Sequence, residues 1–356
     1  MSALFEPLKL GNIQLNNRVV MAPLTRCRAT EDNVPTELMA TYYAQRADAG
    51  LIIAEATMVM PGNSAFYREP GIHSDEQVAG WRKITDAVHQ NGGKIVLQLW
   101  HGGRACHPVL NDGKTPVAPS ALSINGYVHT PQGKKDYVVP QALNTEDIPA
   151  IVKGFVKATI NAKAAGFDGV EIHGANGYLI DEFLRDSANI RNDNYGGSLE
   201  NRSRLLFEVL DGVINVWDSG NVGLRISPIN SSNSMRDSDP EALTRYLAER
   251  LNDYQLAYFH VMRSDFLQKQ QGDVLSVASH LYHGNLISNM GYDYAEANDA
   301  VGQGHVAAVA FGSAFIANPD LPYRFEHGLA LASPNPKTFY THDSQGYTDY
   351  PKAEEG

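Results

Sequence analysis

Three polar residues lie close together near the middle of the chain, in the stretch Glu171-Ile-His-Gly-Ala-Asn-Gly-Tyr178. His173 and Asn176 offer two hydrogen-bond donors that can converge on one oxygen, the arrangement that polarises a carbonyl or stabilises a developing enolate. Tyr178 is a weak acid that can deliver a proton without being ionised at neutral pH. The alternative is a structural loop in which Asn176 caps a turn and Tyr178 packs, and these three residues alone favour that alternative.

Other polar residues stand where apolar runs end, namely Thr25, Glu55, Gln98 and Arg225. Each of them taken singly is equally well explained as satisfying a hydrogen bond at the mouth of a barrel. An arginine in such a place is harder to explain, because a buried cation without a partner is costly. Arg225 therefore indicates an anion or a hydrogen-bond acceptor nearby.

Two further groupings suggest different chemistry. His101, Cys106 and His107 are metal-ligating types, but they share one loop without a tetrahedral ligand set, so we expect no metal site. Glu55 and Glu171 are a possible carboxylate pair of a cofactor-free barrel hydrolase of the glycosidase kind. No Gly-x-Ser-x-Gly nucleophile motif lies near a strand end. The hydrolase stays the alternative function.

Short apolar runs alternate with longer amphipathic segments along the whole chain. Runs of this kind are typical of parallel strands buried on both faces. We predict strands at 19–24, 51–56, 94–100, 169–173, 222–227, 258–262, 285–288 and 305–311, and helices at 35–49, 75–90, 145–166, 198–217, 239–254, 273–283, 293–301 and 319–329, with Thr145 as a helix cap. Eight strand–helix pairs predict a single α/β domain over residues 1–356, a (β/α)8 TIM barrel.

Two segments interrupt this alternation. Residues 8–15 are predicted to form a hairpin that turns at Gly11-Asn12 and caps the N-terminal mouth of the barrel. Residues 102–144 form a long loop after the third strand, rich in Gly and Pro, with a possible hairpin of its own. Since barrel chemistry takes place at the carboxyl ends of the strands, we expect this loop to lie over the active-site face.

The composition excludes several classes of partner. The 356 residues carry a net charge of -11, and only the short Lys134-Lys135 run is basic, so we expect neither nucleic-acid nor membrane binding. No apolar run reaches the roughly 18 residues of a spanning helix, and the N-terminus lacks a signal-peptide pattern. Two cysteines, Cys27 and Cys106, are too few for a disulfide framework, which favours a cytoplasmic enzyme.

The chain resembles the old yellow enzyme family of flavin-dependent ene-reductases over essentially its whole length. The matching stretches are Met21-Ala-Pro-Leu-Thr-Arg26, Leu97-Gln-Leu-Trp-His-Gly-Gly-Arg104, His173 to Leu184, Tyr195-Gly-Gly-Ser-Leu-Glu-Asn-Arg202 and Gly346-Tyr-Thr-Asp-Tyr-Pro351. Five motifs in order are far more specific than a single glycine loop. The most similar subgroup is that of the bacterial reductases of N-ethylmaleimide and nitrate esters.

The resemblance implies a non-covalently bound FMN and a hydride donor, NADPH or NADH. Thr25 would bond the flavin C4 carbonyl, while Gln98 and Arg225 would hold the pyrimidine end, with Arg225 stabilising negative charge on the reduced flavin. Pro23, Leu24 and Ala56 would pack against the ring, and Asn289, Gly291, Gly312 and Ser313 would surround the phosphate. The thermophilic-type branch has a cysteine where Thr25 stands, so this residue favours the yeast-like branch.

The same resemblance assigns the substrate end. His173 and Asn176 would bind the activating group, Tyr178 would protonate the substrate, and Phe66, Trp100 and Tyr340 would line the pocket. The implied reaction is the reduction of the C=C bond of enones, maleimides or nitroalkenes, and possibly of nitrate esters, by a monomer or a homodimer. A barrel whose site has decayed into a binding or structural role is a second rival.

Two positions depart from the family pattern. Ser313 stands where the family usually has an arginine that pairs with the FMN phosphate, and Arg263, at the end of the sixth strand, is a possible substitute. Phe66 stands where the family often has a tyrosine, which removes one polar contact from the expected substrate pocket.

Overall fold

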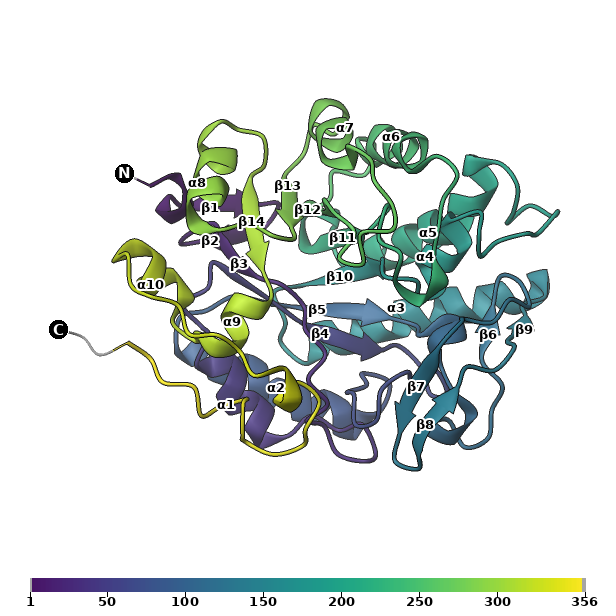
Figure 1. The fold of residues 1–356 in the computed structure, drawn as a ribbon, viewed down its shortest axis with the longest axis horizontal. Coiled ribbons are helices and arrows are strands. Elements are labelled where there is room, and N and C mark those ends of the chain that lie inside the picture. Colours follow the sequence, from purple (N-terminus) through teal and green to yellow (C-terminus); the bar gives the residue numbers. More distant parts are fainter. Residues whose placement is uncertain (1, 354–356) are drawn as a thin grey trace.

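The computed structural model describes residues 2–353, and its centre is a closed barrel of eight parallel strands (Figure 1). Each barrel strand pairs with the barrel strand that follows it along the chain, and the last, β14, pairs with the first, β3. The strands are β3 (Val19–Met21), β4 (Leu51–Met58), β5 (Ile95–Trp100), β10 (Gly169–Gly174), β11 (Val222–Ile226), β12 (Tyr258–Met262), β13 (Leu286–Asn289) and β14 (Ala308–Phe311). All their residues are buried, and the predicted (β/α)8 barrel is confirmed.

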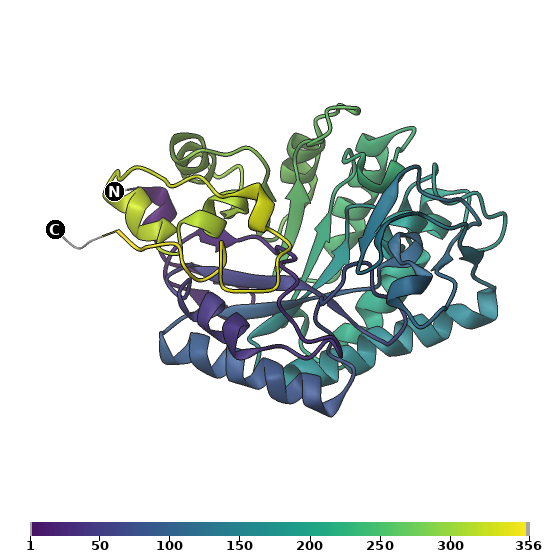
Figure 2. The same cartoon turned by 60° about the horizontal axis from the view of Figure 1, so that its bottom comes forward.

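Helices surround the strands because each has one apolar face that needs cover. In the turned view the blue and teal helices lie along the lower edge of the barrel, whereas green and yellow helices of the C-terminal part lie higher (Figure 2). The helices are α1 (Glu37–Ala44), α2 (Asp75–Gln90), α3 (Ile148–Ala164), α4 (Leu179–Leu184), α5 (Leu199–Ile214), α6 (Pro240–Leu251), α7 (Val274–Leu281), α8 (Tyr294–Gly302), α9 (Ser313–Ala317) and α10 (Leu321–Glu326). Within residues 2–353, no helix is both long and apolar enough to cross a membrane.

Several predicted helix ends were wrong. Residues 35–49 contain only the shorter helix α1, and residues 319–329 only α10. Thr145 does not cap α3, because residues 145–147 form a 3-10 turn before that helix begins. The Thr145 hydroxyl instead donates a hydrogen bond to the Asp193 carboxylate at 3.1 Å. That partner lies 48 residues away, so nothing in the neighbouring residues indicated it. The short helix α4 was also missed.

The predicted N-terminal hairpin is present as β1 (Leu8–Leu10) and β2 (Ile13–Leu15). Gly11 turns it with φ +55°, and a Cβ there would lie 2.3 Å from the carbonyl oxygen of Gly220. The backbone N–H of Asn12 donates to the same carbonyl at 2.8 Å. Since Gly220 closely precedes β11, the hairpin packs at the N-terminal end of the barrel, as predicted.

The long segment between β5 and α3 carries its own small sheets. A hairpin of β7 (Tyr127–Thr130) and β8 (Gly133–Asp136) lies outside the ring of barrel strands (Figure 1). A second pair, β6 (Val117–Ala118) and β9 (Gln141–Ala142), is parallel. The segment after α10 returns past α1, and both this segment and the hairpin help to form the cavities described next.

Candidate active site

A cavity of about 560 Å³ opens at the carboxyl ends of the barrel strands. Of the sixteen residues that the sequence nominated for catalysis, cofactor or substrate, all but Trp100 line it. They are Pro23, Leu24, Thr25, Ala56, Phe66, Gln98, His173, Asn176, Tyr178, Arg225, Asn289, Gly291, Gly312, Ser313 and Tyr340. The fold brings them together because parallel strands of a barrel all end on one rim.

His173 and Asn176 both present a hydrogen-bond donor to this cavity. The ring Nδ1 of His173 accepts a hydrogen bond from the backbone N–H of Ala175 at 3.2 Å. The single ring proton of the neutral imidazole is therefore on Nε2. Burial, with Arg225 nearby, holds the pKa of His173 well below its usual value, so the ring is neutral. The Asn176 carbonyl accepts from the Asn230 amide at 2.7 Å, which leaves its own amide N–H groups free to face inward.

Tyr178 stands immediately beside these donors, at the start of α4. Its ring meets the His173 ring edge-on with centroids 5.2 Å apart. Burial raises the pKa of Tyr178 well above its ordinary value, although part of the ring faces the cavity. The hydroxyl therefore keeps its proton at any working pH. Asn233, which lies within hydrogen-bonding range of Tyr178, was missed by the sequence reasoning and was signalled only by an Asn/Ser-rich loop after β11.

Trp100 does not line the substrate space as predicted. It is fully buried and packs edge-on behind Tyr178, with ring centroids 4.3 Å apart, and it also contacts Phe66. Trp100 is the last residue of β5, and its side chain lies in the wall of the cavity. Its position in the strand could not indicate on which side of that wall the ring lies.

The opposite part of the cavity is polar and carries positive charge. Arg225 and Arg26 line it, and among residues 2–353 no Asp or Glu does, although the chain as a whole has a net charge of -11. The Arg26 guanidinium donates to Tyr42, Phe339 and Gly346, so Arg225 supplies the positive charge. The buried Arg225 Nε and Asn289 Oδ1 have no hydrogen-bond partner among residues 2–353. Buried polar atoms are normally paired, so two unpaired ones beside a cavity favour a ligand there. In a flavin, a pyrimidine carbonyl fits the Arg225 N–H, and a donor of the ribityl end fits the Asn289 oxygen.

A third part of the cavity lies where β13 and β14 end. Gly291 and Met290 have φ +73° and +90°, and the Ser313 backbone begins α9 directly after Gly312. Arg263 does not line the cavity. Its guanidinium forms a bidentate pair with Glu296 at 2.5 and 2.8 Å and bonds the Met290 carbonyl at 2.7 Å. Arg263, the possible substitute for the family arginine that is missing at Ser313, is therefore already paired with Glu296.

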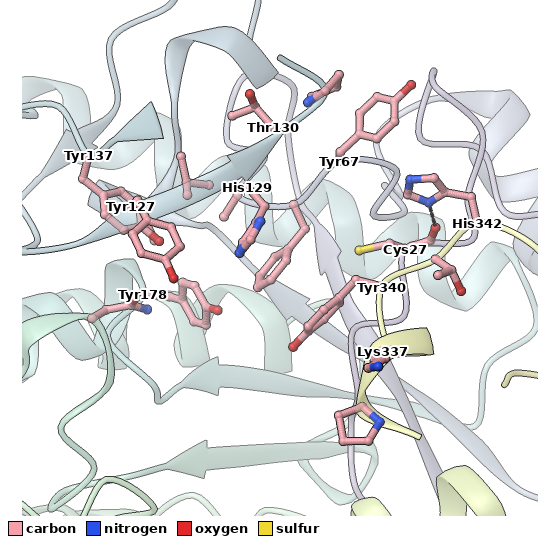
Figure 3. Close-up of a pocket in the computed structure, with 18 residues that line it drawn as sticks. Cys27, Tyr67, Tyr127, His129, Thr130, Tyr137, Tyr178, Lys337, Tyr340 and His342 are labelled. Atoms are coloured by element: carbon pink, nitrogen blue, oxygen red, sulfur yellow. Dashed lines mark hydrogen bonds between the residues drawn. The ribbon is translucent and has the colours of Figure 1, made fainter. Parts of the chain in front are cut away.

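A second cavity of about 500 Å³ adjoins the first and shares Phe66, Tyr178 and Tyr340 with it. It lies between hairpin β7–β8, the loop around Tyr67 and the segment after α10. Figure 3 shows Tyr178 toward one side of it, with Cys27 and His342 toward the other. Among residues 2–353, its lining includes five tyrosines and no carboxylate, and its basic side chains are Lys337, His129 and His342. This aromatic lining suits a flat or bulky substituent of a molecule whose reacting part lies beside Tyr178.

The alternative chemistries find no site here. Glu55 and Glu171 line neither cavity, and both are fully buried. Glu55 accepts hydrogen bonds from the Arg26 backbone and the Tyr43 hydroxyl, so it has no access to a substrate. Among residues 2–353, no group of three His, Cys, Asp or Glu side chains is placed to hold a metal ion. The carboxylate pair expected for the alternative hydrolase was wrong.

Comparisons with known proteins agree with this site. The model of the NADH:flavin oxidoreductase / NADH oxidase family matches residues 3–332. A probable flavin mononucleotide-dependent alkene reductase of Leishmania infantum is 49% identical, over 98% of this chain and 97% of its own. Among solved structures, the old yellow enzyme of Trypanosoma cruzi has a TM-score of 0.96 at 46% identity, covering 99% of each chain.

Morphinone reductase in complex with tetrahydroNAD gives a TM-score of 0.94 at 44% identity and covers 99% of this chain and 98% of its own. The predictions of a flavin-dependent alkene reductase, of FMN and of a nicotinamide hydride donor are thereby confirmed, and the hydrolase is not supported. The chain belongs to the NADH:flavin oxidoreductase / NADH oxidase family and is an FMN-dependent oxidoreductase of the old yellow enzyme type.

Proposed function

We propose that this protein reduces the C=C bond of activated alkenes (enones, maleimides and nitroalkenes), with nitrate esters as further acceptors. One observation carries the proposal most strongly. Two neutral donors, from His173 and Asn176, face the same cavity as Arg225, with the protonated Tyr178 beside them. This arrangement polarises a carbonyl or nitro oxygen and supplies a proton next to it.

The lining residues divide between cofactor and substrate. Thr25, Gln98 and Arg225 would bond the polar edge of the flavin, Pro23, Leu24 and Ala56 would pack on its ring, and Asn289, Gly291, Gly312 and Ser313 would hold the ribityl phosphate end. When bound, FMN accepts a hydride from NADPH or NADH and supplies it to the alkene; the protein's part is orientation and electrostatics.

The substrate end is formed by side chains from several parts of this chain. His173 and Asn176 bind the activating oxygen, and Tyr178 donates its hydroxyl proton to the α-carbon of the alkene. Phe66 and Tyr340, whose ring centroids lie 5.8 Å apart, flank the passage into the second cavity. That cavity has room for a bulky substituent, so the proposal includes polycyclic or long-chain enones and not only small ones.

The finer features of the molecule belong to the same proposal. We infer that residues 1–356 act as one barrel domain, in which residues 102–144 lie over the active-site face. The two free, buried cysteines support a reducing, cytoplasmic location. A monomer or a homodimer, without nucleic-acid partners, is consistent with the charge of -11.

The test begins with the colour of the purified protein. We expect a flavin spectrum, and acid precipitation should release all of the flavin as FMN because no side chain in the cavity is an evident covalent tether. Anaerobic stopped-flow mixing with NADPH or NADH should bleach it, and 2-cyclohexenone or N-ethylmaleimide should restore the colour. A colourless protein that consumes neither nicotinamide would refute the function and favour a barrel with a binding or structural role.

A further inference from the structure

Two fully buried polar residues inside the barrel have no part in the function proposed above. Glu171 on β10 and His260 on β12 have no exposed surface and line neither cavity. Barrel interiors are normally filled by branched apolar side chains, and burying an ionisable group there is costly unless it is paired. A pair of ionisable groups at this depth therefore calls for an explanation.

Their contacts connect them to the polar side chains that do line the cavity. One carboxylate oxygen of Glu171 accepts the Gln98 amide N–H at 2.7 Å, and the other lies 3.0 Å from Nδ1 of His260. The other ring nitrogen of His260, Nε2, has no hydrogen-bond partner among residues 2–353. Because Gln98 donates to Glu171, its carbonyl oxygen is left as the end that can face an N–H group in the cavity.

The same carboxylate acts on Arg225 through its charge. Arg225 pairs in register with His173 on one side and His260 on the other, and among residues 2–353 no carboxylate lies within 4.0 Å of it. Burial lowers the pKa of Arg225, and the negative charge of Glu171 acts against that shift. Burial keeps the pKa of His260 below its ordinary value, so a neutral imidazole does not cancel the carboxylate.

We propose that Glu171 and His260 are positioning residues for the flavin: together they hold Gln98 in place, and the Glu171 charge limits how strongly Arg225 stabilises reduced FMN. The inference rests on the proposed function. It assigns the two residues separable effects, since Glu171 influences both the geometry and the charge of the site, whereas the neutral His260 influences only its geometry.

The experiment compares FMN dissociation constants and flavin midpoint potentials in holoenzyme variants. Glu171→Gln removes the charge and keeps the shape, so reduced FMN should gain at least tenfold in affinity relative to oxidised FMN. For a two-electron couple, that is a rise of about 30 mV in the midpoint potential. His260→Leu should weaken FMN binding several-fold without moving the potential, and His260→Asn, which can still donate to Glu171, should restore binding.

Asp237→Asn is the matched control, because Asp237 forms a buried pair with Arg202 at 2.9 Å and neither residue lines a cavity. It should leave the potential unchanged. If Glu171→Gln does not fold, Glu171→Asp keeps the charge and should bind FMN less tightly at the parent potential. Parent-like FMN constants in both Glu171→Asp and His260→Leu, or an equal potential shift in Asp237→Asn, would overturn the inference. A parent protein that binds no FMN would instead refute the proposed function.

Discussion

Tyr178 combines an intact proton with direct access to the cavity. Because burial raises its pKa well above the ordinary value, the hydroxyl is protonated throughout the working range. We expect Tyr178→Phe to slow alkene reduction by about 10²–10⁴-fold, the usual contribution of a general acid. Stopped-flow traces should show that flavin reduction by the nicotinamide, which needs no proton donor, keeps its rate. Equal losses in both half-reactions would indicate a packing role.

The donors of His173 and Asn176 predict which ligands the site prefers. Both are neutral and point at one region, so they should bind a phenolate, whose oxygen resembles the enolate formed in the reaction. The complex with oxidised enzyme should show a long-wavelength charge-transfer band. Replacing both residues by alanine should abolish the band in a spectral titration. A band that persists at unchanged affinity would place the oxyanion site elsewhere.

Ser313 predicts that FMN is held less tightly than in relatives with an arginine at this position. A hydrogen bond to a charged group is worth roughly 1.5–3 kcal/mol, against about 1 kcal/mol for a neutral pair. Since Arg263 is already paired with Glu296, no other arginine replaces the missing charge at this end of the cavity among residues 2–353. Ser313→Arg should therefore lower the FMN dissociation constant by a few-fold to about thirty-fold, as measured by fluorescence titration. An unchanged or higher constant would show that another cation already serves the phosphate.

At the scale of elements, two buried arginines fasten the C-terminal segment to the barrel: Arg26 donates to the Phe339 and Gly346 carbonyls, and Arg28 makes more bonds to the segment. Arg28, in the loop between β3 and α1, donates to the backbone oxygens of Thr338, Phe339, Asp343 and Gln345 and to the Thr341 hydroxyl. This segment carries Tyr340 to the junction of the two cavities. The wall of the substrate space therefore depends on a residue at least 310 positions earlier in the chain.

Arg28→Leu should release this segment. With five hydrogen bonds lost at about 1 kcal/mol each, we expect the free energy of unfolding to fall by roughly 3–5 kcal/mol. Hydrogen exchange should speed up within residues 338–347, and KM for bulky enones should rise more than KM for 2-cyclohexenone. Arg250→Leu, at an exposed arginine paired with Asp253, serves as the control and should change neither. Unaltered exchange in the segment would contradict the fastening role.

At the scale of the whole molecule, buried acids set how stability depends on pH. Burial raises the pKa of both Glu69 and Glu182 to about 8, from 4.5 when unfolded. Below pH 4.5 both carboxyl groups are protonated in the folded and in the unfolded protein. Between pH 4.5 and 8 they are protonated only in the folded protein, so the free energy of unfolding falls as the pH rises. His101, with its pKa lowered to about 4, acts in the opposite sense, but only below about pH 6.5.

We therefore expect the free energy of unfolding in urea to decrease between about pH 6.5 and 8. A difference of one in pKa corresponds to about 1.4 kcal/mol. Glutamine at positions 69 and 182 cannot ionise. It can still accept the hydrogen bonds that Glu69 and Glu182 accept from the backbone N–H groups of Ala65 and Arg104, both at 2.8 Å. The double variant should show a flatter profile over this range. A slope equal to that of the parent would mean that other groups carry the pH dependence.

The sequence by itself determined the barrel and most of the rim. Short apolar runs that alternate with amphipathic segments are typical of parallel strands, and the carboxyl ends of the strands of a barrel meet on one side. Thr25, Gln98, His173 and Arg225 could therefore be assigned to one site from their positions at strand ends. The family motifs supplied the residues on loops, such as Asn176, which periodicity does not position.

Tertiary structure decided what local patterns do not contain, because each of these features depends on a partner distant in the chain. The Asn176 amide is oriented by Asn230, 54 residues later, and Glu171 binds His260, 89 residues later. Thr145 turned from helix cap to partner of Asp193, and Arg263 was paired with Glu296. Trp100 became part of the wall because rings from other segments cover it. A strand end fixes where a side chain starts, but only packing from elsewhere in the chain fixes what it faces.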